Sequence, residues 1–296
     1  MNELESCTLC PRNCKINRYK TVGVCGAAKE MKVAHYGLHM WEEPIISGET
    51  GSGTIFFSYC NLKCIFCQNY KISTGGYGKE ISEERFQELC LDLQKQGANN
   101  INLVTPTHYV PQIVSSIQKI KGKELKIPIV YNTSSYENVS TIRMLDGIVD
   151  VYLADLKYFD DTLACQYSHA KDYFHYATLA IDEMIKQVGQ FVIKDDLMVR
   201  GVIVRILILP GHGDDAKKLV QHLYNTYKDA IIISLMNQYT PLKHFVQFPN
   251  LNSKVSDEEY QDVIDFALNL GVEYAFIQEG ETQSESFIPN FNCSDI

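Results

Sequence analysis

Hydrophobic residues in this chain fall into short continuous runs that alternate with longer stretches of helical periodicity. The runs at 54–58, 101–104, 127–131, 149–156, 197–209 and 230–235 are rich in β-branched residues and predict strands, the longest of them bent at Gly201. Apolar runs at 31–38 and 274–277 also suggest strands. Because strands and helices alternate regularly, we expect parallel strands joined by right-handed crossovers.

The helices between these strands have recognisable ends. Ser82 predicts the start of a helix that Gly97 ends, and Pro111 predicts the start of the next helix. Ser256 and Glu259 fit a capping box. Further helices are expected around 142–145, over 172–188, from 214 or 215, and from 257 to a stop at Gly271.

Six or so strand–helix units suit a partial barrel better than a flat sheet, although the pattern alone does not separate the two. We expect this α/β barrel over 54–280, after a cysteine-rich extension at 1–30 and a connecting segment at 31–53, and before a polar tail at 281–296. Within the connecting segment, 41–44 predicts a turn, and the glycine-rich stretch 48–53 predicts a flexible lead-in to the first barrel strand.

Composition narrows the class of protein. The net charge is −9 with Lys and Arg dispersed, which argues against nucleic acid as the main partner. No apolar run is long enough to span a membrane, and the start of the chain lacks a secretory signal. We therefore expect a cytoplasmic protein, and its 10 cysteines indicate metal ligation rather than disulfides.

Three cysteines, Cys60, Cys64 and Cys67, follow the first predicted barrel strand at the spacing C-x3-C-x2-C. Three thiolates from one tight loop can bind three irons of a 4Fe–4S cluster and leave the fourth iron open for chemistry. Structural zinc sites use four ligands, commonly in C-x2-C pairs, and ferredoxin loops use C-x2-C-x2-C. An open-iron cluster is therefore favoured over zinc, a fully ligated cluster or inert thiols.

Four more cysteines lie near the N-terminus: Cys7, Cys10, Cys14 and Cys25. Four thiolates can bind either zinc or an auxiliary iron–sulfur cluster, and the spacing does not choose between them. Four free thiols are the alternative without a metal. A metal here could be structural, bind substrate or relay electrons.

Polar residues recur at the predicted carboxyl ends of the strands, where parallel α/β folds bind ligands. These ends are 105–108, 132–135, 155–157, 205 with 211–215, and 236–239. Taken alone, Arg205 could be a paired barrel residue, and Asp155 and Lys157 could form only an ion pair. Their recurrence at nearly every strand end indicates a site at the barrel mouth.

The cysteine loop resembles that of the radical S-adenosylmethionine (SAM) enzymes, in which an aromatic residue, here Phe66, precedes the third cysteine. Two further stretches resemble the branch of this family around glycyl-radical-activating enzymes such as pyruvate formate-lyase activase. They are Asp155-Leu156-Lys157 and residues 204–211, which include Arg205 and end in Pro-Gly. The resemblance covers most of 54–280 and implies a TIM-like (β/α)6 partial barrel.

This resemblance also implies a cofactor site. Residues at the third and fourth strand ends would lie near the SAM carboxylate, where a monovalent cation can bind, and Arg205 would contact SAM. Gln238 would lie near the adenosine. The full expected set is Phe66, Thr107, Asn132, Thr133, Asp155, Lys157, Arg205 and Gln238. No residue beyond the cluster ligands is assigned to catalysis.

The chain departs from that branch in three places. Thr105-Pro106-Thr107-His108 stands where the family usually has a Gly-Gly-Glu that binds the SAM amino group. Tyr59 precedes the first cluster cysteine, where Gly is common. The N-terminal cysteines are absent from the simple activase and resemble an uncharacterised activase-like subgroup. These differences affect the expected substrate more than SAM cleavage.

The resemblance implies an enzyme in which a reduced 4Fe–4S cluster cleaves SAM to methionine and a 5′-deoxyadenosyl radical, which abstracts hydrogen from a substrate. By analogy with the activases we expect a protein or peptide backbone as substrate, with a small metabolite as the alternative, and flavodoxin or ferredoxin as electron donor. A non-enzymatic iron–sulfur or zinc protein is the alternative of another class. The polar strand ends argue against it, because an electron carrier needs no SAM-shaped mouth.

Overall fold

One large sheet organises the computed structural model, which describes residues 3–278, 291, 293 and 296. Its strands follow the order β10-β9-β8-β6-β5-β4-β2-β1-β3, and the two strands at the ends of this order do not pair, so the sheet is open. The parallel strands are β2 (Ser52–Phe57), β4 (Ile101–Val104), β5 (Ile129–Thr133), β6 (Val151–Asp155), β8 (Leu197–Leu207), β9 (Ile232–Met236) and β10 (Ala275–Ile277).

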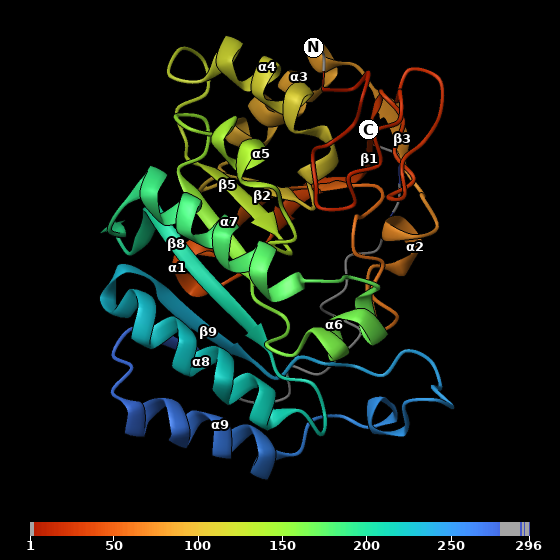
Figure 1. The fold of residues 1–296 in the computed structure, drawn as a ribbon. Helices are drawn as coiled ribbons and strands as arrows, with labels where there is room; N and C mark the ends of the chain where they lie inside the picture. The colour runs from red at the N-terminus through yellow and green to blue at the C-terminus, as the bar shows by residue number, and fades with distance from the viewer. Residues whose placement is uncertain (1–2, 279–290, 292, 294–295) are drawn as a thin grey trace.

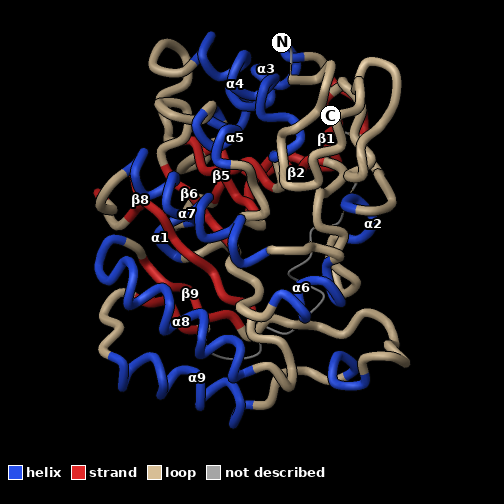
Figure 2. The backbone as a smooth tube through the Cα atoms, in the orientation of Figure 1, coloured by secondary structure: helices blue, strands red, loops and turns tan. Residues whose placement is uncertain are grey.

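Helices follow these strands and cover the outer face of the sheet (Figures 1 and 2). Strand–helix units run from β2 to α9, which confirms the predicted (β/α)6 partial barrel, and β10 adds a short further strand. The helices are α1 (Pro44–Ser47), α2 (Tyr70–Ser73), α3 (Glu83–Lys95), α4 (Val110–Ile120), α5 (Val139–Arg143), α6 (Asp161–Ser168), α7 (Tyr173–Val188), α8 (Gly213–Tyr227) and α9 (Asp257–Leu270), with 3₁₀ turns at Thr107–Tyr109, Lys228–Ala230 and Pro249–Asn252.

Two strands run against the main direction of the sheet, and a further short strand at the edge of the sheet runs with it. β1 (Met31–His39) pairs antiparallel with β2, and β3 (Lys79–Ile81) pairs antiparallel with β1. β7 (Val192–Lys194) forms a hairpin with β8 through Asp195 and Asp196, whose φ values of 51° and 61° suit a tight hairpin turn. The sequence predicted β1 but not β3 or β7, because each of these two strands has only 3 residues and includes a lysine, so neither stands out as an apolar run.

Two apolar layers hold the barrel together. One lies between the sheet and the outer helices and includes Leu89 of α3 and Ile181 of α7. The other lies inside the barrel, where Ile46 of α1 packs with Val151 and Ile203. The part of the connecting segment around α1 therefore packs inside the half-barrel, whereas its first part, β1, belongs to the sheet.

The predicted flexible lead-in at 48–53 is wrong for its second half. Gly51, Ser52 and Gly53 are buried, and Ser52 begins β2. A Cβ on Gly53 would lie 2.8 Å from both the Ala98 side chain and the Asn100 carbonyl. Glycine serves close packing of the strand here, not freedom of the chain.

The helix starts follow the predicted caps with one difference. Ser82 and Ser256 each accept a hydrogen bond from a backbone N–H of the first turn, at 3.1 Å. In a capping box the Glu259 side chain would accept a hydrogen bond from the Ser256 backbone N–H. Here the Glu259 carboxylate instead accepts hydrogen bonds from the N–H groups of Gly211 and Gly213, at 3.1 and 3.0 Å. Glu259 thereby fixes the loop that follows β8.

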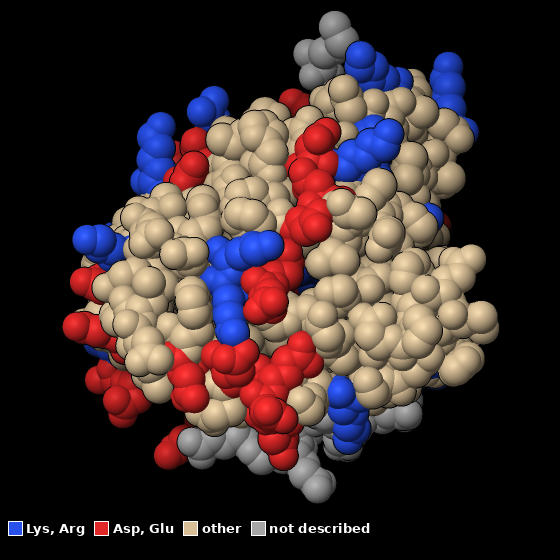
Figure 3. Space-filling view, turned by 60° about the horizontal axis from the view of Figure 1, so that its bottom comes forward, with Lys and Arg blue, Asp and Glu red and all other residues tan. Residues whose placement is uncertain are grey.

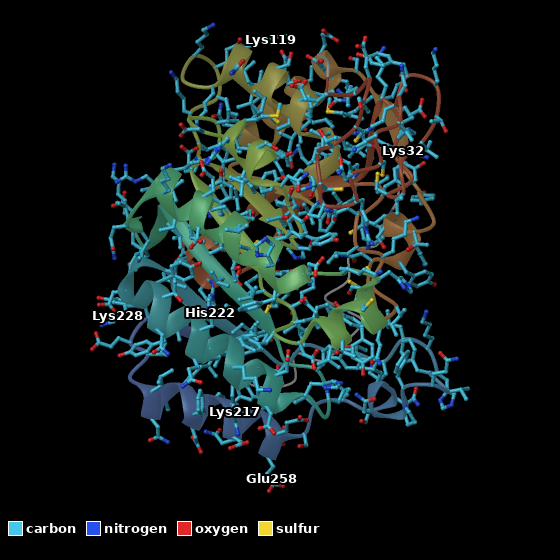
Figure 4. All side chains as sticks on the ribbon, viewed as in Figure 1. Lys32, Lys119, Lys217, His222, Lys228 and Glu258 are labelled. Carbon is cyan, nitrogen blue, oxygen red and sulfur yellow. The ribbon has the colours of Figure 1, made fainter. Side chains whose placement is uncertain are left out.

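Charged and aromatic side chains join neighbouring helices on the surface. Lys217 of α8 pairs with Asp262 of α9, and the ring centroid of His222 lies 4.9 Å from that of Phe174 on α7. Figure 4 labels Lys217 and His222 on α8. Acidic side chains form a band across the face shown in Figure 3, in keeping with the net charge of −9. None of the described helices is long and apolar enough to cross a membrane. Most of the predicted tail at 281–296 lies outside the described residues.

Candidate active site

The cysteine loop leaves the carboxyl end of β2 along a tight path. Tyr59 and Lys63 have φ values of 77° and 61°, in the left-handed region that favours glycine. This explains why glycine is common at the position of Tyr59 in the family that the loop resembles. Along this path Cys60, Cys64 and Cys67 all line one pocket at the barrel mouth.

The loop sulfurs have hydrogen-bonding neighbours from the surrounding elements. Contacts of this kind to metal-bound sulfur tune the stability and reduction potential of a cluster. They are Ser168 Oγ donating to Cys64 Sγ (2.9 Å), Ser73 Oγ beside Cys67 Sγ (3.3 Å) and the Leu62 N–H donating to Cys60 Sγ (3.4 Å). Sequence analysis did not identify Ser168, which lies far along the chain at the end of α6.

The donor set of this loop fits an iron–sulfur cluster. Burial raises the pKa of Cys64 to about 12, against the influence of Lys157, and also raises the pKa of Cys67. Positive charge stabilises the thiolate form of a buried cysteine, and the irons of a cluster would supply such charge here. Among the described residues, no three His, Cys, Asp or Glu side chains gather closely enough to hold one metal ion. Cysteines on separate irons of a cluster do not need that arrangement.

The pocket gathers most of the predicted cofactor residues. Phe66 stands on the loop side, and Trp41 and Glu42 come from the connecting segment. The predicted residues that line the pocket are Cys60, Cys64, Phe66, Cys67, Asn132, Thr133, Asp155, Lys157, Arg205 and Gln238. Thr107 is not among the lining residues, because it is buried beneath the strand ends.

Arg205 is the centre of a polar network beneath the loop. The parallel register of β6 and β8 places Arg205 opposite Asp155, whose Oδ1 accepts from Nε at 2.8 Å. The other guanidinium nitrogens donate to Asn132 Oδ1 at 2.6 Å and Glu42 Oε2 at 3.1 Å. Lys157 Nζ donates to the second oxygen of Asp155 at 2.7 Å. Both Asp155 oxygens are therefore engaged by cationic side chains.

The charges of this network stabilise one another. Burial alone would raise the pKa of Asp155, but Arg205 and Lys157 hold it below its usual value. Burial would lower the pKa of Lys157, and the charges of Asp155 and Cys64 raise it instead. The pKa of Arg205 is raised by its carboxylate partners. Burial raises the pKa of Glu42, and Arg205 opposes that shift.

Glu42 is the residue of this network that the sequence did not indicate. It lies in a stretch predicted as a simple turn, and it reaches the site from inside the half-barrel rather than from a strand end. Besides its ion pair with Arg205, its Oε1 accepts from the Asn102 and Asn132 side-chain amides, at 3.1 and 3.2 Å. Glu42 therefore adds a carboxylate to the site that a search of the strand ends alone does not identify.

A second unpredicted carboxyl, Glu137, is buried below the third strand end. Its Oε1 accepts from the hydroxyls of Thr107 and Thr133, both at 2.6 Å, and of Tyr131 at 3.1 Å. Burial raises the pKa of Glu137 to about 7, although these hydroxyls lower it. The hydroxyls of two predicted SAM-binding threonines thus point to a carboxyl of the protein.

The N-terminal cysteines lie beside the barrel, with Cys7 and Cys25 buried. Backbone N–H groups donate to Cys14 Sγ at 3.5 Å and to Cys25 Sγ at 3.4 Å. Burial raises the pKa of Cys10 to about 12 and raises that of Cys25. These sulfurs do not form a ready ligand set for one ion in the described part of the chain, so a metal here remains a prediction.

The family model described as the radical SAM superfamily matches residues 54–223 of this chain. An uncharacterized protein of Methanocaldococcus jannaschii is 29% identical over 274 residues, which cover 90% of this chain and 75% of that protein.

Two solved structures share the fold of this chain. SuiB of Streptococcus suis bound to its precursor peptide SuiA superposes with a TM-score of 0.51 at 15% identity, over 75% of this chain and 46% of SuiB. SuiB bound to SAM gives a TM-score of 0.50 at 12% identity, over 75% of this chain and 49% of that one. At these identities the likeness concerns the barrel alone.

Proposed function

Because this chain belongs to the radical SAM superfamily, we propose that it is an enzyme that binds a 4Fe–4S cluster and SAM in the pocket described above. The observation that carries the proposal is the meeting of the three loop cysteines and the Arg205 network in one pocket. When bound, the cluster supplies the electron that splits SAM into methionine and a 5′-deoxyadenosyl radical.

The residues of this chain divide the work of binding. Cys60, Cys64 and Cys67 hold the cluster. Arg205 is fixed by three acceptors on separate elements, so it can meet an anionic ligand group without reorganising. We assign Gln238 to the adenosine side of SAM. The apolar layer below the network excludes water from the site.

The test is anaerobic reconstitution with iron and sulfide, reduction with dithionite, and addition of SAM. We expect about four irons from the loop cluster and formation of 5′-deoxyadenosine. Cys64→Ala should abolish deoxyadenosine formation, whereas Cys165→Ala, at an exposed thiol, should leave it unchanged. Deoxyadenosine formation that survives Cys64→Ala would refute the proposal.

We propose a protein or peptide segment as the hydrogen donor. The support is the shape of the opening. The site pocket and a neighbouring pocket share Trp41, Glu42 and Gln238, so the two together form one elongated opening. Met40 and Pro44 extend its wall. Deuterium transfer from backbone-labelled peptides into 5′-deoxyadenosine would test this substrate class, and transfer only from small metabolites would replace it.

We propose flavodoxin or ferredoxin as the reductant, and zinc or a second cluster as the metal of the N-terminal cysteines. Four thiols within one short extension, two of them buried, support a metal there. Metal analysis decides between the two: about four irons with one zinc indicate zinc, and about eight irons indicate a second cluster. Retention of neither metal by Cys7, Cys10, Cys14 and Cys25 would contradict this part of the proposal.

A further inference from the structure

Arg12 fastens the N-terminal extension to the cysteine loop. Its Nε donates to the carbonyl of Asn61 at 2.8 Å, and its Nη2 donates to the carbonyls of Leu62 and Ser168 at 3.2 and 3.1 Å. Its Nη1 donates to the carbonyl of His169. One side chain therefore binds four backbone carbonyls. Two of them lie about 50 positions away in the sequence, and the other two lie about 157 positions away.

These carbonyls belong to the two segments that surround one cluster cysteine. Asn61 and Leu62 lie inside the loop between Cys60 and Cys64. Ser168 ends α6, and its hydroxyl donates to Cys64 Sγ at 2.9 Å. By bridging the two segments, Arg12 fixes the distance between Cys64 and its hydrogen-bond donor.

The contact pattern requires a guanidinium. A planar fork of five N–H donors can reach several carbonyls at once, and an ammonium cannot hold the same geometry. The guanidinium also lies over the ring of Tyr136, 5.3 Å from its centroid. None of the ion pairs among the described residues includes Arg12, so its partners there are backbone carbonyls and an aromatic face.

The extension has other attachments that do not touch the loop. The buried Arg18 donates to the carbonyls of Ala28 and His108, and the Thr141 hydroxyl donates to the Leu9 carbonyl at 2.7 Å. Loss of Arg12 should therefore free the cysteine loop while the extension stays in place. This separates a role in the site from a role in general stability.

We propose that Arg12 is a positioning residue for the cluster loop: it holds Cys64 and Ser168 together and so sets the stability and electronic environment of the cluster. The inference rests on the proposed function, since it presupposes a cluster on Cys60, Cys64 and Cys67. Through Arg12 the N-terminal extension would support the cluster loop, in addition to any metal that its own cysteines bind.

The test compares Arg12→Lys and Arg12→Gln with the wild-type protein after anaerobic reconstitution. Both variants should lose the cluster to an iron chelator about tenfold faster, because both lose the fork that binds the loop carbonyls. The electron paramagnetic resonance spectrum of the reduced cluster should change in both. Arg143→Gln, which removes an exposed guanidinium paired with Glu183, should match the wild type in both measurements.

Ser168→Ala supplies a second measurement if the Arg12 variants fold poorly. It removes the hydroxyl but leaves the carbonyl that Arg12 binds, and it should lower the reduction potential of the cluster. Wild-type chelation rates and spectra in Arg12→Gln would overturn the proposal, as would full rescue by Arg12→Lys, which would show that charge alone acts. A wild-type protein that binds no cluster would overturn the proposed function instead.

Discussion

Glu137 gives a direct test of the electrostatics inside the barrel, because only 1% of its surface is exposed. Burial raises its pKa from 4.5 to about 7, and hydrogen bonds from Thr107, Thr133 and Tyr131 only partly oppose this. Glu137 therefore remains protonated in the folded protein over a pH range in which the unfolded chain has already ionised it. Substitution by Gln removes this titration and keeps a carbonyl oxygen for the three hydroxyls.

The sign and size of the effect follow from the two pKa values. Because the folded-state pKa is raised, the stabilising contribution is fully present below pH 4.5 and is lost as the pH rises through 7. Each pKa unit corresponds to about 1.4 kcal/mol, so the whole shift represents about 3 kcal/mol, of which about 2 kcal/mol disappears between pH 5.5 and pH 8. For a large domain this is a change in Tm of roughly 4 °C.

The assay is anaerobic thermal unfolding of the wild type and Glu137→Gln at pH 5.5 and pH 8. The Tm of the wild type should fall more than that of the variant, by roughly 4 °C, as the pH is raised. Glu88→Gln, at an exposed ion pair with Arg85, serves as control and should keep the wild-type pH dependence. Equal pH dependence in the wild type and Glu137→Gln would refute the argument that this carboxyl stays protonated in the fold.

Three further predictions follow from the geometry. Arg205→Lys loses the fork between three acceptors, and calorimetry should show about tenfold weaker binding of SAM; unchanged affinity would contradict the role of Arg205 in the site. Gly26→Ala places a Cβ 2.7 Å from the ring of Tyr59 and should lower the free energy of unfolding by about 2 kcal/mol, measured with urea. Gly97→Ala, also at positive φ but with open space around it, should cost about 1 kcal/mol, and equal losses would exclude the steric cause. Ser256→Ala removes the α9 cap and should cost about 1 kcal/mol in the same measurement, so an unchanged value would rule out that cap as stabilising.

The sequence was sufficient for the barrel because its elements obey local rules. Apolar runs became β2, β4, β5, β6, β8 and β9, and the serines before α3 and α9 cap those helices as predicted. Asp155 and Arg205 were both expected at the barrel mouth, because parallel strands bring their carboxyl ends to one edge. Their direct pairing follows from the register of β6 with β8, which only the structure shows.

The parts that the sequence could not supply depend on packing between distant segments. Glu42 belongs to a segment that folds back inside the half-barrel, and no periodic pattern reports such a path. Thr107 resembles a ligand-binding residue in sequence, but its hydroxyl donates to Glu137, thirty positions later. Arg12 contacts only backbone carbonyls and an aromatic face among the described residues, so no complementary charge in the sequence could have indicated its partners.

Lys157 connects the two halves of the site. Its ammonium donates to Asp155 at 2.7 Å, and its charge opposes the rise that burial causes in the pKa of Cys64. The charges of Asp155 and Cys64 in turn raise the pKa of Lys157 against the effect of burial, so Lys157 stays charged between the carboxylate and the sulfur. In the proposed site a charged Lys157 would favour the thiolate form of Cys64, while its partner Asp155 accepts a hydrogen bond from Arg205 on the other side of the pocket. Under the proposed function, cluster ligation and the preparation of the cofactor pocket would therefore depend on the same buried ion pair.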